Sequence, residues 1–204
     1  MAREKNGQKK HVVKKVLLSI LIIFVIFFAG LGIYKLYVHM VTPSEFMIVD
    51  DNYFDYQKHY ECSGYSSAYV LRSLGEDVTG LELHGSFTGK NPDGSLGPVG
   101  LRKNLNAAGY RCSILSGSLE DLKYRVSRGT PVIALIRVNT FQPYLHYVPV
   151  VGYDDEYIYV AESLKNLANA ENENYNRAIE VEDFLELWKT SNSLDNVFLT
   201  IKND

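Results

Sequence analysis

The chain has 204 residues, of which 46% are hydrophobic and 22% charged, a composition typical of globular proteins and unlike that of disordered or collagen-like chains. Its formal net charge of -3 is unevenly spread: residues 1–15 carry six Lys or Arg against Glu4 alone, whereas residues 39–204 carry 14 basic and 23 acidic side chains. This acidic body argues against a nucleic-acid partner, because binding nucleic acid depends on neutralising phosphates.

The first element in chain order is a candidate membrane helix. The uncharged run VLLSILIIFVIFFAGLGIY follows the basic cluster and approaches the about 20 apolar residues that a helix needs to cross a bilayer. We therefore predict a transmembrane helix at 16–38, and the positive-inside rule makes residues 1–15 cytosolic. A tether at 39–48 then leads to one extracellular domain at 49–204, held at the cell membrane by a single pass. The alternative is a cleaved signal peptide, whose apolar core is usually shorter.

Apolar periodicity and turn residues predict the elements of the domain. Helices are expected at 62–74, at 101–108, from the Ser118-x-x-Asp121 capping box to Gly129, and at 182–190. Strands are expected at 131–138, 147–153, 157–161, 178–181 and 197–202, and the second and third of these form a hairpin. A loop rich in Gly and Pro covers 91–100. Helices that precede an antiparallel sheet are typical of the α+β class.

Four residues form a candidate thiol active site. Cys62 opens a predicted helix, whose dipole and free N–H groups favour the reactive thiolate form. His146 lies at the entry to a strand, where it could take up and return a proton. Glu162 lies at the same end of the hairpin and could orient the His146 ring. The Gln57 amide, together with the Cys62 N–H, could stabilise a developing oxyanion. No cofactor and no metal ion are expected.

Structural interpretations of the same residues remain open. An isolated Cys is most often a small buried hydrophobic residue, and an isolated His at a strand end is most often a residue with ordinary hydrogen-bond partners. A disulfide between Cys62 and Cys112 is a further alternative, because the predicted compartment lies outside the cell. Cys112 falls on a predicted strand, where a buried thiol is ordinary.

Four segments carry a resemblance to a known family. QKHYECSGYSSAYVLRSLG at 57–75 resembles the nucleophile helix of bacterial papain-like cysteine peptidases of the bacteriocin-processing group, which remove double-glycine leaders. HYVPVVGYDDEYIYVAES at 146–163 is similar to that group's His segment, and RAIEVEDFLELW at 177–188 to the element that follows it. Residues 97–109 resemble its middle segment. The resemblance implies a papain-like fold, with N-terminal helices packed on an antiparallel sheet, and a Cys-His-acid peptidase site.

The sequence departs from the family's usual pattern at each site. The family usually has Gly followed by Pro or Ala after the nucleophile, whereas Ser and Gly follow Cys62 here. Gln57 stands one residue closer to the Cys than usual. Glu162, followed by Ser, replaces the usual Asp-Pro, and its extra methylene requires a shifted backbone or a different helper. Asn166 and Asp154 are the reserve candidates for that helper.

The favoured function is a membrane-anchored, outward-facing cysteine peptidase that hydrolyses peptide bonds. Relatives that process leaders are fused to a transporter, but this chain has no nucleotide-binding motif and no multi-span region. Its substrate would then be an exported peptide, a surface protein or a peptide bridge of the cell wall. The segments 91–100 and 163–176 are expected to border the cleft. The alternatives are a catalytically impaired domain that binds a peptide or protein partner, and a Cys-His amidase or acyl-transfer enzyme acting on wall material.

Overall fold

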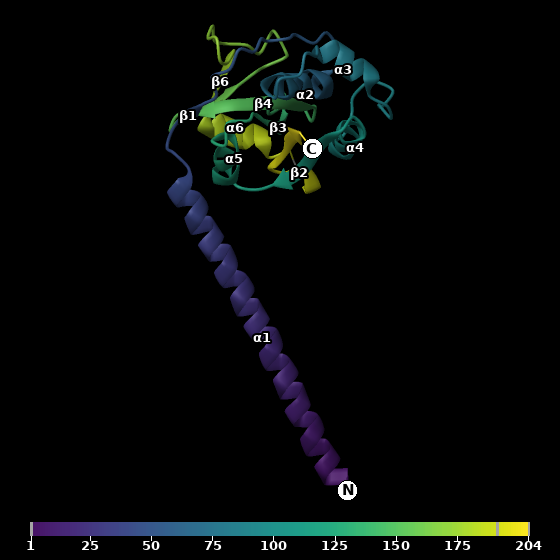
Figure 1. The fold of residues 1–204 in the computed structure, drawn as a ribbon, viewed down its shortest axis with the longest axis vertical. Coiled ribbons are helices and arrows are strands. Elements are labelled where there is room, and N and C mark those ends of the chain that lie inside the picture. The colour runs from purple at the N-terminus through teal and green to yellow at the C-terminus, as the bar shows by residue number, and fades with distance from the viewer. Residues whose placement is uncertain (1, 191, 204) are drawn as a thin grey trace. The chain divides into compact units, whose positions relative to one another are not determined.

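The computed structural model describes residues 2–190 and 192–203, and it describes side chains except those of residues 2–13, 16 and 192. The chain divides into two units between Val41 and Thr42. The first unit is the helix α1, Ala2–Val41 (Figure 1). Its part Leu17–Val41 is long and apolar enough to cross a membrane, although a signal sequence near an N-terminus has the same properties. The basic side chains before residue 14 lie outside the described side chains.

The second unit is an α+β domain, as predicted. Its helices are α2 (Cys62–Ser73), α3 (Gly80–Ser86), α4 (Pro98–Ala107), α5 (Leu119–Val126), α6 (Val181–Trp188) and the short 3-10 helix η1 (Asn192–Leu194). Its strands are β1 (Phe46–Met47), β2 (Tyr110–Ser116), β3 (Val132–Arg137), β4 (Leu145–Tyr153), β5 (Tyr157–Val160), β6 (Arg177–Glu180) and β7 (Val197–Asn203).

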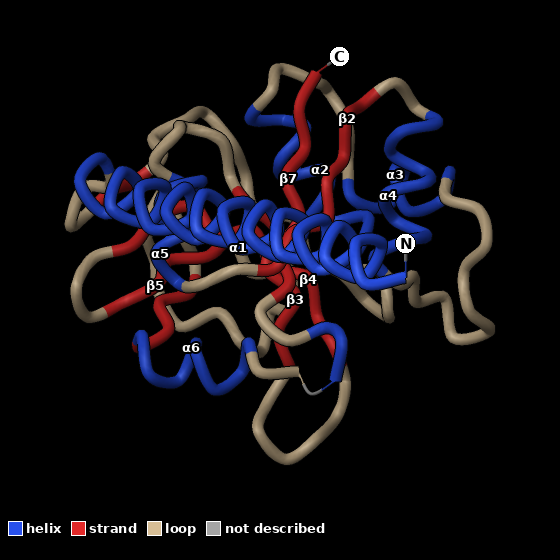
Figure 2. The backbone as a smooth tube through the Cα atoms, turned by 90° about the horizontal axis from the view of Figure 1, so that it is seen from below, coloured by secondary structure: helices blue, strands red, loops and turns tan. Residues whose placement is uncertain are grey.

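The strands form one antiparallel sheet. Its order is β2-β7-β3-β4-β5-β6, and β1 pairs with β4. Figure 2 shows β3 and β4 side by side, in agreement with their six-residue register from Val132–Val150 to Arg137–Leu145. The predicted β4–β5 hairpin is present. β4 carries His146, which pairs with Ile136 of the neighbouring strand β3, so the sheet fixes the backbone of this residue.

Helices cover both faces of the sheet, which therefore separates two apolar cores. Figure 1 shows α2 on one side of β4, and α5 and α6 on the other. The core on the α2 side includes Leu71, Leu101, Ile133, Tyr147 and Leu199. The core on the α6 side includes Leu122, Ile136, Val148, Phe184 and Trp188. Alternate residues of β3 and β4 thus enter different cores, as the two-residue period of a strand requires.

Several predicted boundaries needed correction. The helix expected at 101–108 begins at Pro98 and ends at Ala107, since Pro is well suited to the first turn of a helix. The strand expected at 178–181 is 177–180, and the helix expected at 182–190 is 181–188. The helix α3 was not predicted, although a complete capping box formed by Thr79 and Glu82 opens it. The packing of α5 and α6 on the second face of the sheet was also not predicted.

The irregular segment between β1 and α2 is fastened to α2. Arg72 donates from Nε to Asn52 Oδ1 at 2.8 Å and from Nη2 to the carbonyl oxygen of Tyr53 at 2.8 Å. Its Nη1 donates to the carbonyl oxygen of Val78 at 3.0 Å. One helical side chain therefore holds both the segment that precedes the helix and the segment that follows it.

Candidate active site

Cys62 is the first residue of α2 and is buried. Its helix lies very close to α3, because Gly64 has no side chain: a Cβ at this position would lie 2.3 Å from His84 Cβ and 2.8 Å from the Gly80 carbonyl oxygen. The N-cap residue Glu61 makes no side-chain cap. The first N–H groups of α2 therefore receive no side-chain acceptor from the N-cap residue, and an oxyanion site requires N–H groups without such an acceptor.

His146 is the second residue of β4, and it lies between Cys62 and Glu162. Its Nε2 donates to Glu162 Oε1 at 2.7 Å, and the side chains of both residues are almost completely buried, at 2% and 0% exposure. The Cys62 side chain lies close enough to His146 to contribute to the raised pKa of the imidazole. Since Nε2 is occupied by Glu162, Nδ1 is the ring nitrogen left for the thiol. The structure thus brings together three of the four site residues predicted from the sequence.

A β-bulge between β4 and β5 determines which way Glu162 faces. Val150 pairs with Val160, but Gly152 pairs with Tyr159, so β4 holds one extra residue, Val151, at this point. The pairing of the two strands therefore shifts by one residue on the side that leads to His146.

The shift places Glu162 on the same face as His146. Side chains alternate along a strand, so His146 shares a face of β4 with Val150, and Glu162 shares a face with Val160. Val150 and Val160 are direct partners, and the ladder continues in the same register just beyond β5. Without the extra residue, Glu162 would lie on the opposite face.

Two neighbouring residues at the start of β6 hold Glu162, and sequence reasoning assigned neither of them to the site. Arg177 Nη1 donates to Glu162 Oε2 at 2.8 Å. Asn176 binds the main chain of Glu162 on both sides: its Oδ1 accepts from the Glu162 N–H at 2.6 Å and its Nδ2 donates to the Glu162 carbonyl oxygen at 2.9 Å. The N–H of Leu164 also donates to Glu162 Oε1, at 2.7 Å. The only sequence signal was their position at the edge of the segment 163–176.

Electrostatics favour an ion pair between His146 and Glu162. Burial by itself would lower the pKa of His146, but the Glu162 charge and the hydrogen bonds with Cys62 and Glu162 raise it well above 6.5. Burial by itself would raise the pKa of Glu162, but His146, the Leu164 N–H and Arg177 hold it well below 4.5. A charged imidazolium beside a carboxylate is the arrangement that stabilises a neighbouring thiolate.

The side chain of Gln57 is hydrogen-bonded next to Glu162 and does not point freely into the site. Its Oε1 accepts from the Ser163 hydroxyl at 2.7 Å, and its N–H donates to the Ser163 carbonyl oxygen at 3.0 Å. Its Nε2 donates to the carbonyl oxygen of His59 at 2.5 Å. Gln57 therefore joins the segment before α2 to the residue that follows Glu162, and its role at an oxyanion stays a prediction.

The two reserve helpers do not occupy the place of Glu162. Asp154 closes the β4–β5 turn, where its side chain accepts from the N–H groups of Glu156 and Tyr157 and from the Tyr159 hydroxyl. Asn166 is exposed. Glu162 is thus the acid that meets His146.

The alternative of a disulfide is wrong, because Cys62 and Cys112 are both free. Cys112 lies on β2 in the core on the α2 side. Burial raises the pKa of its thiol to about 11, so it remains protonated near neutral pH and unreactive.

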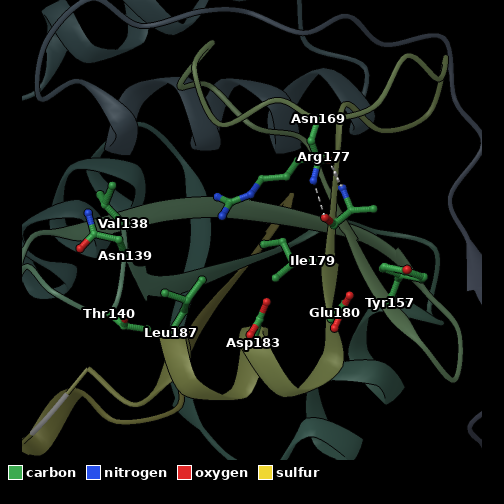
Figure 3. A pocket seen from close by; sticks show the side chains of 11 residues that line it. Val138, Asn139, Thr140, Tyr157, Asn169, Arg177, Ile179, Glu180, Asp183 and Leu187 are labelled. Carbon is green, nitrogen blue, oxygen red and sulfur yellow. Dashed lines mark hydrogen bonds between the residues drawn. The ribbon is translucent and has the colours of Figure 1, made fainter.

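A pocket of about 580 Å³ adjoins the site on the α6 side. Figure 3 shows Arg177 reaching from β6 toward Val138 and Asn139, while Glu180 and Asp183 line the opposite part of the pocket. The segment 163–176 contributes Asn169, which holds both main-chain polar groups of Ala178. Arg177 therefore separates this pocket from the Glu162 carboxylate.

The predicted loop 91–100 is attached next to the site from the other side. The Tyr147 hydroxyl, one residue beyond His146, donates to the Leu96 carbonyl oxygen at 3.1 Å.

Residues 48–195 match the Peptidase_C39 like family, and the chain belongs to this family. Its fold is similar to that of a C39-like peptidase from Bacillus anthracis, with a TM-score of 0.59 and 16% identity over 79% of this chain and 99% of that one. It is also similar to a double glycine motif protease from an AMS/PCAT transporter, solved in complex with the leader peptide (TM-score 0.55, 20% identity, 78% and 94% coverage). The peptidase domain of Streptococcus ComA, a bi-functional ABC transporter involved in a quorum sensing pathway, gives a TM-score of 0.59 at 12% identity, with 76% and 100% coverage. No curated protein matches the chain significantly.

Proposed function

We propose that the protein is a membrane-anchored, outward-facing cysteine peptidase whose reacting groups are Cys62 and His146. The observation that carries the proposal is the position of His146, which is hydrogen-bonded to Glu162 Oε1 at 2.7 Å and lies beside the Cys62 side chain, which contributes to its raised pKa. A thiol, an imidazole and a carboxylate in this order are the parts that covalent hydrolysis of an acyl group requires.

The proposed reaction starts from a Cys62 thiolate and a His146 imidazolium. The Cys62 thiolate attacks the carbonyl carbon of the peptide bond, and the carbonyl electrons move onto the oxygen. His146 gives its proton to the departing amine as the C–N bond breaks, which leaves a thioester on Cys62. His146 then takes a proton from water as the water oxygen attacks the thioester; the C–S bond breaks, which releases the carboxylic acid and restores the Cys62 thiolate beside the His146 imidazolium. Glu162 keeps the imidazole oriented and compensates its charge.

The oxyanion is assigned to donors at the start of α2. The main-chain N–H of Cys62 lies at the positive end of the helix. The Gln57 amide contributes once it turns away from the His59 carbonyl oxygen, and substrate binding would drive that change. The Gln57 contacts with Ser163 keep this side chain within the site in the free enzyme.

The substrate class is a peptide. One structural neighbour is a peptidase in complex with a leader peptide, which supports a peptide substrate for this chain. The pocket beside Arg177 and the loop 91–97 lie on two sides of His146 and form the walls along which an extended chain would bind.

The membrane anchor is assigned to the segment Leu17–Val41, and the outward orientation to the basic residues before it. The domain boundaries 1–15, 16–38, 39–48 and 49–204 are part of this proposal. A protease added to intact spheroplasts should digest the domain and spare the first fifteen residues. Protection of the domain, or a mature chain that begins after the apolar segment, would refute the anchor or its orientation.

The activity is tested with the full-length chain in detergent micelles and a complex mixture of peptides. New peptide termini are counted by mass spectrometry for the wild type, for Cys62→Ala, and for Cys112→Ala as the matched control. Termini that appear with the wild type and with Cys112→Ala, but not with Cys62→Ala, would support the proposal. Equal cleavage by Cys62→Ala would refute it.

A second candidate is a domain that binds peptides without cleaving them. The engagement of the Gln57 amide with His59 favours this candidate, because an oxyanion would lack one donor in that state. Binding of peptides from the same mixture by the wild type, with no new termini, would decide in its favour.

A further inference from the structure

We propose that Arg177 is a positioning residue of this peptidase: its guanidinium holds one oxygen of Glu162, and this keeps the other oxygen directed at His146. The inference rests on the proposed function, because it assigns a partner to the acid of that site.

The first observation is how the two carboxylate oxygens are shared. Oε1 accepts from His146 Nε2 and from the Leu164 N–H, both at 2.7 Å. Oε2 accepts from Arg177 Nη1 at 2.8 Å. Glu162 is 1% exposed while Arg177 is in place, so its carboxylate depends on protein donors. If Arg177 were absent, Oε2 would be a buried charged oxygen without this bond, and such a group is costly.

The second observation concerns charge during the reaction. The imidazolium of His146 neutralises Glu162 before proton transfer, but His146 is neutral once it has given its proton to the departing amine. Arg177 stays protonated throughout, because a guanidinium does not titrate near neutral pH. It therefore compensates the buried carboxylate in the half of the cycle in which His146 does not.

The third observation is that the surrounding charges cannot take over this task. Asp55 and Arg72 line a small cavity together with Glu162. Arg72 is already paired with Asp55, because Arg72 Nη1 lies 3.9 Å from Asp55 Oδ2. The cations that contact the Glu162 carboxylate within the described part of the chain are His146 and Arg177.

The main chain of Glu162 is fixed separately from its side chain. The side chain of Asn176, 3% exposed, binds both the N–H and the carbonyl oxygen of Glu162. Because the backbone is held in this way, removal of the Arg177 guanidinium leaves the carboxylate free to rotate toward the pocket of about 580 Å³ that Arg177 lines. Loss of Arg177 should therefore act on the direction of the carboxylate and leave the fold of β6 in place.

The test measures alkylation of Cys62 by iodoacetamide, which requires no known substrate. The full-length chain carries Cys112→Ala, so that Cys62 is its single thiol. The rate constant is measured from acid to alkaline pH for this background and for Arg177→Gln, Arg177→Lys and His146→Ala. The matched control is Arg137→Gln: Arg137 lies on β3 and donates to the carbonyl oxygens of Thr140 and Glu186.

We expect Arg177→Gln to lower the rate at neutral pH about tenfold, the effect of losing roughly one charge-assisted hydrogen bond. The acid limb of the pH–rate profile of Arg177→Gln should shift to higher pH by on the order of one unit. The reason is that an opposite charge nearby lowers the pKa of a carboxyl by about that much or more, and this variant removes that charge. Arg177→Lys should recover most of the rate, since it keeps the charge, and Arg137→Gln should match the background.

The outcomes separate the inference from the function on which it rests. If His146→Ala alkylates as fast as the background, no Cys-His pair exists and the proposed function fails. If His146→Ala is slow but Arg177→Gln behaves like Arg137→Gln, the function stands and the inference is wrong. A slower Arg177→Gln with an unshifted acid limb and no recovery in Arg177→Lys would show a purely structural role, and would also overturn the inference.

Discussion

Glu162→Asp is the most informative single change, because it keeps the charge and removes one methylene. In the wild type, the carboxylate reaches His146 at 2.7 Å and Arg177 at 2.8 Å at the same time. Shortening the side chain withdraws the carboxylate by about 1.5 Å, one carbon–carbon bond length. Because Asn176 fixes the main chain, the backbone cannot advance by that distance to compensate.

The size of the effect follows from these distances. Withdrawal by one bond length leaves at least one of the two contacts at roughly 4 Å, which is too long for a hydrogen bond. A hydrogen bond to a charged group is worth about 1.5–3 kcal/mol, which corresponds to about 10- to 100-fold in rate when the lost bond orients His146. We therefore expect Glu162→Asp to slow peptidase activity and Cys62 alkylation by that factor.

The assay is the alkylation rate of the full-length chain in micelles, with Glu162→Gln as the companion variant. Glu162→Gln keeps the length and one acceptor but loses the charge. Comparable losses in the two variants would show that reach and charge are both required. If Glu162→Asp reacts as fast as the wild type, the acid does not act through the observed distances, and the reasoning about its length is wrong.

The same network sets a pH range for stability. The pKa of His146 is raised from 6.5, so its contribution is fully present below pH 6.5 and is lost as pH rises through the raised value. The pKa of Glu162 is lowered from 4.5 to about 2, so its contribution is fully present above pH 4.5 and is lost as pH falls toward 2. The difference in unfolding free energy between wild type and Glu162→Gln, from denaturant titrations, should be largest between pH 4.5 and 6.5. A difference that is constant with pH would contradict the ion pair.

Four further substitutions have defined outcomes. Cys62→Ala and His146→Ala should each reduce the rate of hydrolysis about 1,000-fold or more, and the double variant should reduce it little further, because the two residues act as one unit. Additive losses in a quantitative cleavage assay would show that the two residues act independently. Cys112→Ala should leave activity intact and lower the unfolding free energy by about 1 kcal/mol in denaturant titration. Loss of activity in this variant would show that the assignment of Cys62 as the nucleophile is wrong. Gly64→Ala should destabilise the domain by about 1–3 kcal/mol, since its Cβ would overlap His84 at 2.3 Å; an unchanged melting temperature would show that α2 and α3 separate freely.

Much of the fold was predictable, because its signals are local. The β4–β5 hairpin follows from two apolar runs around three acidic residues, and the capping box at Ser118 opens α5 as predicted. The Cys62 and His146 segments carried enough pattern to indicate the family. The helix α3 was missed because its seven residues are too few to show a clear apolar period, even though its own capping box is complete.

The parts that were not predicted depend on register and on long-range contact. The single extra residue at Val151 turns Glu162 to the face of His146, and no local signal in a run of valines marks which residue is extra. Arg177 meets Glu162 only because β6 pairs with β5, fifteen residues later in the chain. The departure from the usual acid was visible in the sequence, but the cation that accompanies it was not.

The place of β7 in the sheet has a consequence for biosynthesis. Among the strands of this sheet β7 comes last in the sequence, yet it lies between β2 and β3 and pairs with both. The β2 edge therefore cannot join the rest of the sheet until residues 197–203 have emerged. Such non-local pairing slows folding and leaves strand edges exposed in the meantime. A chain truncated before residue 197 should consequently remain sensitive to proteases along its whole domain.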